Sequence, residues 1–168
     1  TPYTRHLGKD RFAERIGNAY LIGLNSNFMK NVEQNSLEEQ SQFAWLKKTL
    51  KKKHKKDHVI VFLHHPFFLE NYGEEEGYST LSESIRNKYF SLFDEYGVEF
   101  VIAGHLHDNR EANHNGIEMV TTSAAGRQLG TAQPGIRIIQ LRKGNISQQY
   151  FTLEQLPDTR ENVIASFK

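Results

Sequence analysis

Two short apolar runs, each followed at once by histidine, constrain the fold of this chain more than any other feature. Residues 59–63 (VIVFL) are continuously apolar and rich in β-branched side chains, and residues 98–103 repeat the arrangement. A strand that is apolar at every position is covered on both faces, as in parallel or mixed sheets flanked by helices. The sequence therefore predicts an α/β fold in which two strands end in histidine-bearing loops.

Helical periodicity precedes each histidine-bearing run. A capping-box pattern at residues 36–39 predicts the start of a helix that ends within the lysines 51–53. Its expected apolar face consists of four residues: Leu37, Phe43, Leu46 and Leu50. Residues 80–83 open a second predicted helix, which Gly97 ends. Its apolar face is expected to contain six residues: Leu81, Ile85, Tyr89, Leu92, Phe93 and Tyr96.

The rest of the chain adds shorter elements. Residues 19–24 are apolar and precede a turn-rich segment, which predicts another buried strand. Residues 67–78 show no usable periodicity and are expected to form a long loop. After a turn signal at Asn115-Gly116, three strands, expected to be antiparallel, cover residues 117–121, 136–141 and 146–153. We predict one domain over residues 1–156 and a tail, a short helix or frayed, over residues 157–168.

Composition excludes several kinds of site. The 21 basic residues nearly balance the 20 acidic ones, which argues against nucleic acid or a membrane surface as the partner of the whole molecule. The chain has no cysteine, so any metal must use nitrogen and oxygen ligands. No stretch is long and apolar enough to span a bilayer, and we expect a cytoplasmic protein. The sequence begins like the middle of a domain, so we expect an upstream segment to be missing.

Histidines at the ends of two predicted strands are the candidate metal ligands. His64 follows the run 59–63, and His105 and His107 follow the run 98–103. Imidazole binds zinc, iron and manganese, and neighbouring strands of an α/β sheet present their carboxyl ends at one edge, where ligands commonly bind. A single histidine in such a place is more often packed or hydrogen-bonded than metal-bound. The presence of two clusters at strand ends favours a metal site.

The residues around these histidines resemble the calcineurin-like metallophosphoesterase superfamily. Residues 62–66 (FLHHP) are similar to its His-x-Pro block, and residues 104–107 (GHLH) to its Gly-His-x-His block. The resemblance is closest to small calcineurin-like phosphoesterase domain-containing proteins of the serine/threonine-phosphatase type. The shared features are Trp45-Leu46, Val61-Phe62, Phe68-Leu69-Glu70, Asn109 two residues after His107, Gln128-Leu129-Gly130 and Gly135-Ile136-Arg137. The resemblance covers residues 18–156, the later part of the family domain, and implies a partial four-layer αββα sandwich with mixed sheets.

The resemblance also implies an activity and a set of site residues. The family domain holds two divalent metal ions (Mn, Fe or Zn), with His64 and His105 on one ion and His107 on the other. With these ions a water becomes the hydroxide that attacks a phosphate monoester, and the closest proteins imply a phosphoprotein substrate. Three neighbouring residues are either candidates for orienting the ligands or solvated loop residues: His65, Asp108 and Asn109.

The family's carboxylate-bearing blocks are absent from the sequence. No Asp-x-His, Gly-Asp or Gly-Asn-His block occurs, and Gly17-Asn18 is followed by Ala19. Three neutral imidazoles do not offset the charge of two divalent ions, so we expect the chain alone to bind metal weakly and to need ligands from elsewhere. An incomplete domain should also leave sheet edges or apolar faces uncovered, which predicts a homo-oligomer or strand exchange.

Two alternative functions stay open. In the first, the chain is a non-catalytic fragment or binding module that contacts a partner through the acidic loop 74–76 or the lysine run 51–56. In the second, it is a nucleotide or nucleic-acid phosphodiesterase built on the same scaffold. No aromatic residues interleave the lysine run, which argues against nucleic-acid binding there. Residues 123–126 lack the Gly-x-Ser-x-Gly elbow of serine hydrolases. The other four histidines are expected to be exposed: His6, His54, His58 and His114.

Overall fold

The computed structural model describes residues 5–6, 8–142 and 144–167 and has a mixed α/β architecture. Six strands form the main sheet, in the order β1-β2-β3-β4-β6-β5. They are β1 (Phe12–Ile16), β2 (Ala19–Gly23), β3 (His58–Phe62), β4 (Phe100–Ala103), β5 (Arg110–His114) and β6 (Ile117–Thr121). The strands β7 (Gly135–Arg142) and β8 (Asn145–Thr152) form a separate hairpin. The helices are α2 (Ser26–Lys30), α3 (Ser36–Leu50), α4 (Glu83–Tyr96) and α5 (Arg160–Ser166).

The centre of the main sheet is parallel and its two edges are antiparallel. Strands β2, β3, β4 and β6 run in one direction. Helices α3 and α4 return the chain between β2 and β3 and between β3 and β4, and the antiparallel strand β5 returns it between β4 and β6. Tight hairpins add β1 to β2 and β5 to β6. The second hairpin turns at Asn115-Gly116, both with positive φ (53° and 85°), as a two-residue turn of this kind requires. This confirms the turn that the sequence predicts.

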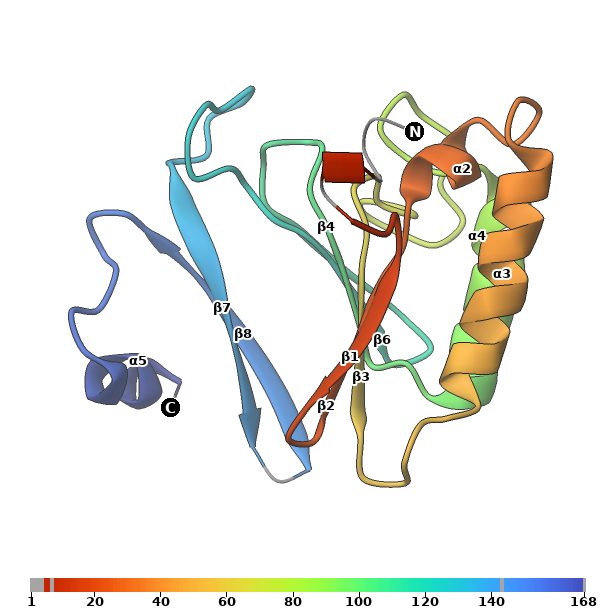
Figure 1. The fold of residues 1–168 in the computed structure, drawn as a ribbon. Coiled ribbons are helices and arrows are strands. Elements are labelled where there is room, and N and C mark those ends of the chain that lie inside the picture. The colour runs from red at the N-terminus through yellow and green to blue at the C-terminus, as the bar shows by residue number, and fades with distance from the viewer. Residues whose placement is uncertain (1–4, 7, 143, 168) are drawn as a thin grey trace.

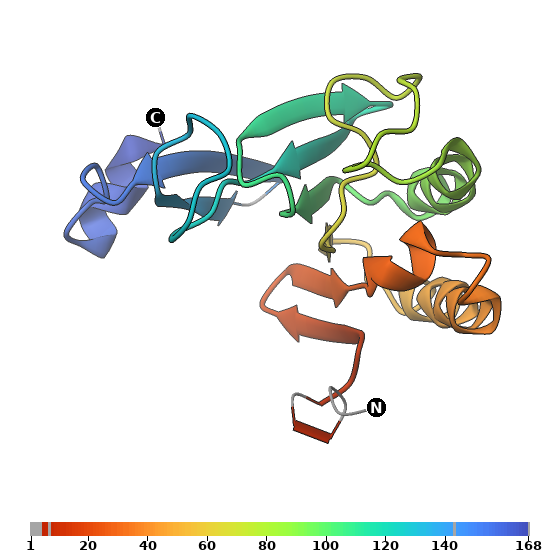
Figure 2. The ribbon, with the colours of Figure 1, turned by 90° about the horizontal axis from the view of Figure 1, so that it is seen from above.

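The sheet is covered on both faces, as the apolar strands predict. Helices α3 and α4 lie side by side on one face (Figures 1 and 2). Side chains that alternate along the strands divide between the faces, so that Val59 and Val61 face the helices while Ile60 faces the β7–β8 hairpin. Beyond the hairpin lies α5, on the side away from the main sheet (Figure 1). The predicted mixed α/β class is confirmed, with a two-stranded hairpin as the second sheet.

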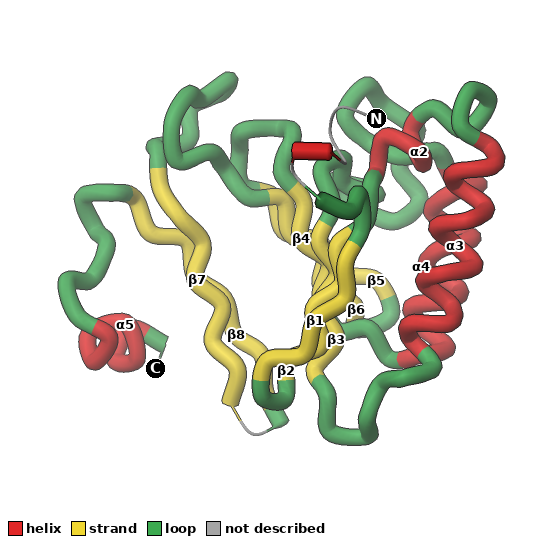
Figure 3. The backbone as a smooth tube through the Cα atoms, in the orientation of Figure 1, coloured by secondary structure: helices red, strands yellow, loops and turns green. Residues whose placement is uncertain are grey.

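The loops that connect the strands to the helices gather at one end of the molecule. In Figure 3 the long loop between β3 and α4 and the loops that follow β4 and β6 lie at the same end of the main sheet. The segment predicted as a loop over residues 67–78 contains no helix or strand. None of the described helices is long and apolar enough to cross a membrane.

Several local predictions were wrong. Leu37 is 77% exposed, because it lies in the first turn of α3, outside the buried face. The first residue of α4 is Glu83, after the N-cap Ser82, while the hydroxyl of Thr80 accepts a hydrogen bond from the backbone N–H of Gly77. Strands β1 and β5 were not predicted, because both lie at sheet edges and are largely solvent-exposed, so neither forms a continuous apolar run.

Two of the four histidines expected at the surface are not exposed. His58 is buried on β3, and its Nδ1 lies 2.8 Å from Oε2 of Glu99. His114 is half-buried and stacks on Tyr72, with ring centroids 3.6 Å apart. His6 and His54 are exposed, as predicted. Sequence polarity around a histidine therefore does not decide its burial, because a neighbouring carboxylate or aromatic ring can cover it.

Candidate metal centre

The candidate ligands lie at the carboxyl ends of two adjacent parallel strands. His64 and His65 follow β3, and His105 and His107 follow β4, whose residue Ile102 is in register with Phe62. The backbone N–H of Gly104 donates to the carbonyl oxygen of His64 over 3.1 Å and joins the two loops. The parallel pairing of two apolar strands therefore brings together histidines about forty residues apart in sequence.

Three imidazoles form one cluster. Nitrogen atoms of His64, His65 and His105 lie within 4.8 Å of one another. The closest pair is Nδ1 of His105 and Nε2 of His64, which are 3.0 Å apart. The rings meet edge to face or tilted, with centroid separations of 4.5 to 4.9 Å. Three ring nitrogens therefore lie close enough together to share one small volume.

The loop after β4 has unusual backbone geometry. His105 and His107 have positive φ, 66° and 53°, in the left-handed region that few residues other than glycine, asparagine and aspartate adopt. The N–H of Leu106, between them, donates to the carbonyl of Gly104 over 2.7 Å. Such strained conformations concentrate at functional sites, where surrounding contacts hold them in place.

The histidine cluster is electrostatically suited to a cation when its rings are neutral. Burial, reinforced by the nearby His105, His64 and Lys30, lowers the pKa of His65 to about 4. Burial also lowers the pKa of His105, with smaller contributions from His64, Lys30 and His107. At neutral pH both rings are therefore uncharged, which is the form in which imidazole binds metals.

His65 is held by a contact that the sequence did not reveal. The hydroxyl oxygen of Ser26, a buried residue at the start of α2, accepts from the backbone N–H of His65 over 2.9 Å. The same oxygen lies 2.9 Å from Nδ1 of the His65 ring. Ser26 in α2, the helix that follows β2, thus fixes the orientation of the His65 ring. Ser26 lies in a turn-rich segment, where a serine carries no signal of this role.

His107 lies outside the cluster of three. Its Nδ1 donates to the carbonyl oxygen of Arg127 over 2.7 Å, so in the neutral ring Nε2 carries a free lone pair. The hydroxyl of Ser123 donates to the backbone carbonyl of His107 over 3.0 Å. The loop between β6 and β7 therefore holds His107 through both its ring and its backbone.

A buried arginine extends this support to the β7–β8 hairpin. Arg137, on β7, has a side chain only 4% exposed. Its Nη2 donates over 2.9 Å to Oδ1 of Asn109, which also accepts from the backbone N–H of Ser123 over 3.0 Å. Asn109 thus links the histidine loop to the loop between β6 and β7 and to strand β7. Asp108 instead pairs with Arg110 over 2.8 Å.

The long loop after β3 contributes a rim to the cluster. The ring of Tyr78, whose side chain is largely exposed, lies 5.6 Å from the ring of His105. Lys30 donates from α2 to the carbonyl oxygens of Thr80 and Gly77 over 2.6 and 2.9 Å, and so ties this loop to the site. Neither residue stands in a recognisable sequence motif.

The cluster fits the nitrogen part of a divalent-metal site. Two nitrogens that each lie about 2.1 Å from one ion are about 3.0 Å apart at the right angles of an octahedral site, and about 3.4 Å apart at the tetrahedral angle of zinc. The octahedral value is the separation of Nδ1 of His105 and Nε2 of His64. Within the described residues, the group of potential ligands contains histidines alone. One ion therefore fits these residues, whereas the charge of two calls for carboxylates as well.

Comparisons with known proteins identify a matching family model and several relatives. The family model of the calcineurin-like phosphoesterases matches residues 3–109. The serine/threonine-protein phosphatase CPPED1 of Bos taurus is 32% identical over 158 residues, which are 93% of this chain and 50% of that protein. The human protein of the same name is 33% identical over 159 residues, 93% of this chain and 51% of its own length. The chain spans about half the length of the curated relatives it matches.

Solved structures with the same fold have low sequence identity. GAP50, the anchor in the inner membrane complex of Plasmodium, superposes with a TM-score of 0.63 at 15% identity, covering 84% of this chain and 49% of GAP50. A dimetal phosphatase from Danio rerio superposes with a TM-score of 0.50 at 15% identity, covering 70% and 51% of the two chains. The matched family model, together with the predicted histidine blocks, leads to one conclusion: this chain belongs to the calcineurin-like phosphoesterase family.

Proposed function

We propose that this chain supplies the histidine ligands of a metal-dependent site that hydrolyses phosphate monoesters, with phosphoserine and phosphothreonine of proteins as the substrate class. The observation that carries the proposal is the 3.0 Å contact between ring nitrogens of His64 and His105 at the ends of adjacent strands. Family membership supports the chemistry, and relatives named as serine/threonine-protein phosphatases support the substrate class.

Each histidine has a distinct role in the proposal. His64 and His105 bind one divalent ion, and His107 binds a second through Nε2, while its Nδ1 stays on the carbonyl of Arg127. Imidazole suits zinc, iron and manganese alike. Bound ions would polarise the phosphoryl oxygens and supply a hydroxide nucleophile. His65, held by Ser26, stands beside the first pair, and Asn109 holds the loop that carries His105 and His107.

Carboxylate ligands must come from residues outside this histidine cluster. Neutral imidazoles carry no charge, and two divalent ions with no anionic ligand repel each other strongly. We therefore expect the 168-residue chain alone to bind one ion and to hydrolyse phosphate esters only when the remaining ligands are supplied. The all-histidine composition of the cluster also supports a second candidate, a chain that binds metal or a partner without catalysis.

Metal binding tests the ligand assignment independently of activity. Titration of the chain with Zn²⁺ or Mn²⁺ in a calorimeter should show that His105→Ala weakens binding by at least about 100-fold, since a direct ligand matters more than the residues that orient ligands. The matched control is His54→Ala, which removes an exposed histidine remote from the cluster and should bind like the parent. Equal affinities of the two variants would refute the assignment.

Activity distinguishes the two candidate functions. The chain, and a longer protein that also contains the remaining length of the relatives, should be assayed with p-nitrophenyl phosphate and with a phosphoserine peptide. Hydrolysis by the longer protein that His105→Ala abolishes, and His54→Ala leaves intact, supports the phosphatase. Metal binding with no hydrolysis by either protein supports the non-catalytic candidate.

A further inference from the structure

Strand β1 presents an open edge of the main sheet. Among the residues that the structure describes it pairs only with β2, and all five of its own residues are exposed. The two-residue turn after Ile16 makes Ile16 and Ala19 a hydrogen-bonded pair, and such pairs alternate along the hairpin. Ala13 and Arg15 therefore direct their backbone N–H and C=O groups away from β2. Within the described part of the chain no residue bonds to these four groups, and Figure 2 shows β1 at the edge of the sheet.

A groove of about 800 Å³ runs between this edge and α3. Its lining combines aromatic rings, Tyr20 and Trp45, with four cationic residues and one acidic residue: Lys9, Arg11, Arg15, Lys52 and Asp10. The guanidinium of Arg11 lies 5.5 Å from the ring centroid of Trp45. Among the residues that the structure describes, neither lysine pairs with a carboxylate. The groove is therefore amphipathic with an excess of positive charge.

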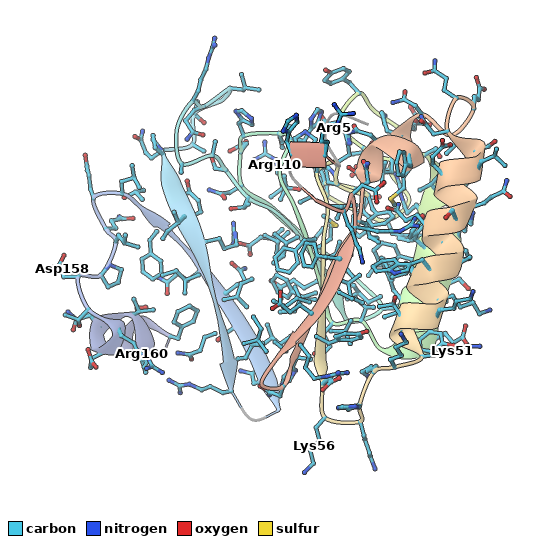
Figure 4. All side chains as sticks on the ribbon, viewed as in Figure 1. Arg5, Lys51, Lys56, Arg110, Asp158 and Arg160 are labelled. Atoms are coloured by element: carbon cyan, nitrogen blue, oxygen red, sulfur yellow. The ribbon has the colours of Figure 1, made fainter. Side chains whose placement is uncertain are left out.

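The positive charge continues beyond the groove. Seven lysines lie close together in the sequence at the end of α3 and in the next turn, and six of them are exposed. They are residues 47, 48, 51, 52, 53, 55 and 56. Figure 4 shows Lys51 and Lys56 reaching into solvent at this end. The whole chain has a formal net charge of only +1, so this surface concentrates positive charge that the rest of the molecule offsets. Arg15 joins the two regions, since its Nη2 donates to the carbonyl of Lys52 over 3.0 Å.

We propose that the β1 edge and the adjoining groove bind an extended acidic segment of a partner protein, which adds a strand to the sheet. The four free backbone groups of Ala13 and Arg15 would pair with the segment, as in other cases of strand addition. Acidic side chains would reach Lys52 and Lys9, and apolar ones would cover Trp45. This inference does not depend on the metal site.

A second copy of the chain fits this edge poorly. Three antiparallel registers bring the free backbone groups of two β1 strands together. The first places Glu14 opposite Glu14 of the other copy, the second places Arg15 opposite Arg11, and the third places Arg15 opposite Arg15. Like charges directly opposite each other destabilise a strand pair. The charge pattern therefore favours an acidic partner over self-association.

Trp45 is the chain's single tryptophan and reports on the groove directly. The probe is a seven-residue peptide of alternating glutamate and valine, blocked at both ends. We expect a saturable change in Trp45 fluorescence that weakens as salt is added. A peptide of alternating lysine and valine should give no change. Equal binding of both peptides, or tighter binding of a single-stranded oligonucleotide than of the acidic peptide, would overturn the proposal.

Variants separate local charge from net charge. Lys52→Glu should weaken binding of the acidic peptide at least about tenfold, as the loss of a close charge pair predicts. Arg142→Glu makes the same charge change at an exposed position of β7 and should leave affinity within about twofold. Equal losses in both variants would show that only net charge matters, and would overturn the docking site.

Backbone pairing has its own test. Ala13→Pro removes one outward N–H, and proline is tolerated on an edge strand, so binding should weaken while the circular dichroism spectrum is retained. The same peptide with alternate N-methylated residues makes the matching change on the ligand and should bind at least about tenfold more weakly. Undiminished binding of the N-methylated peptide would refute strand addition. A doubled mass by light scattering without peptide would assign the edge to a second copy instead.

Discussion

Arg86 provides the sharpest test of how the loop beside the histidine cluster is held. It lies on α4 with no exposed surface, and its guanidinium donates to backbone carbonyls of the loop after β3. Nε donates to the carbonyl of Phe67 over 3.2 Å, and Nη1 donates to the carbonyls of Glu74, over 2.9 Å, and Tyr72. Arg86→Met keeps much of the side-chain volume and removes every donor.

The expected destabilisation follows from these three contacts. A hydrogen bond to a charged group contributes about 1.5–3 kcal/mol, and methionine avoids the cost of burying a guanidinium, which offsets part of the loss. We therefore expect Arg86→Met to lower the free energy of unfolding by about 3 kcal/mol. For a domain of this size that corresponds to a fall in Tm of about 6–12 °C.

Urea unfolding followed by circular dichroism measures this loss. Arg142→Met is the matched control, because it makes the same chemical change at an exposed residue and should stay within about 0.5 kcal/mol of the parent. Hydrogen exchange adds a local measurement. The N–H groups of Leu69 and Glu70, which donate to the carboxylate of Glu74, should exchange faster in Arg86→Met. A change below about 1 kcal/mol, with unchanged exchange, would refute the role of Arg86.

Two further predictions concern buried charged groups. Arg137→Met should weaken Zn²⁺ binding about tenfold, because Asn109 then loses a donor that positions the histidine loop. Calorimetry measures this affinity, and an unchanged affinity would contradict the positioning role of Arg137. Burial acts to raise the pKa of Asp57, but hydrogen bonds from Arg15 and from the backbone N–H of His54 outweigh it and lower the pKa. The ionised carboxylate of Asp57 therefore stabilises the fold above about pH 4, and this stabilisation is lost as pH falls below that value. Asp57→Asn should therefore destabilise at pH 7 and much less near pH 2, as urea unfolding at both pH values can show.

The parts of the fold that the sequence predicted are those specified by strongly apolar segments. Residues 59–63 could be covered on both faces only inside a layered sheet, and parallel neighbours must then present their loops at one edge. Both histidine loops were located in this way. Periodicity failed for Leu37, because an apolar residue in the first turn of a helix can extend past the sheet.

The supporting contacts of the site could not be predicted. Arg86 stands on a helix among polar residues, and nothing local shows that the loop after β3 will wrap its carbonyls around the guanidinium. Ser26 and Arg137 likewise act on histidine loops far away in sequence. Their roles depend on the path of the chain, which only the packed structure determines.

Because His105 and His107 have left-handed backbone conformations, selection for stability and selection for metal binding should favour different residues at these two positions. Folding alone favours glycine, asparagine or aspartate there, because these residues adopt positive φ at least cost. Histidine is retained only if its ring has a use. A library randomised at both positions and selected for stability alone should therefore lose histidine, while the same library selected for metal retention should keep it.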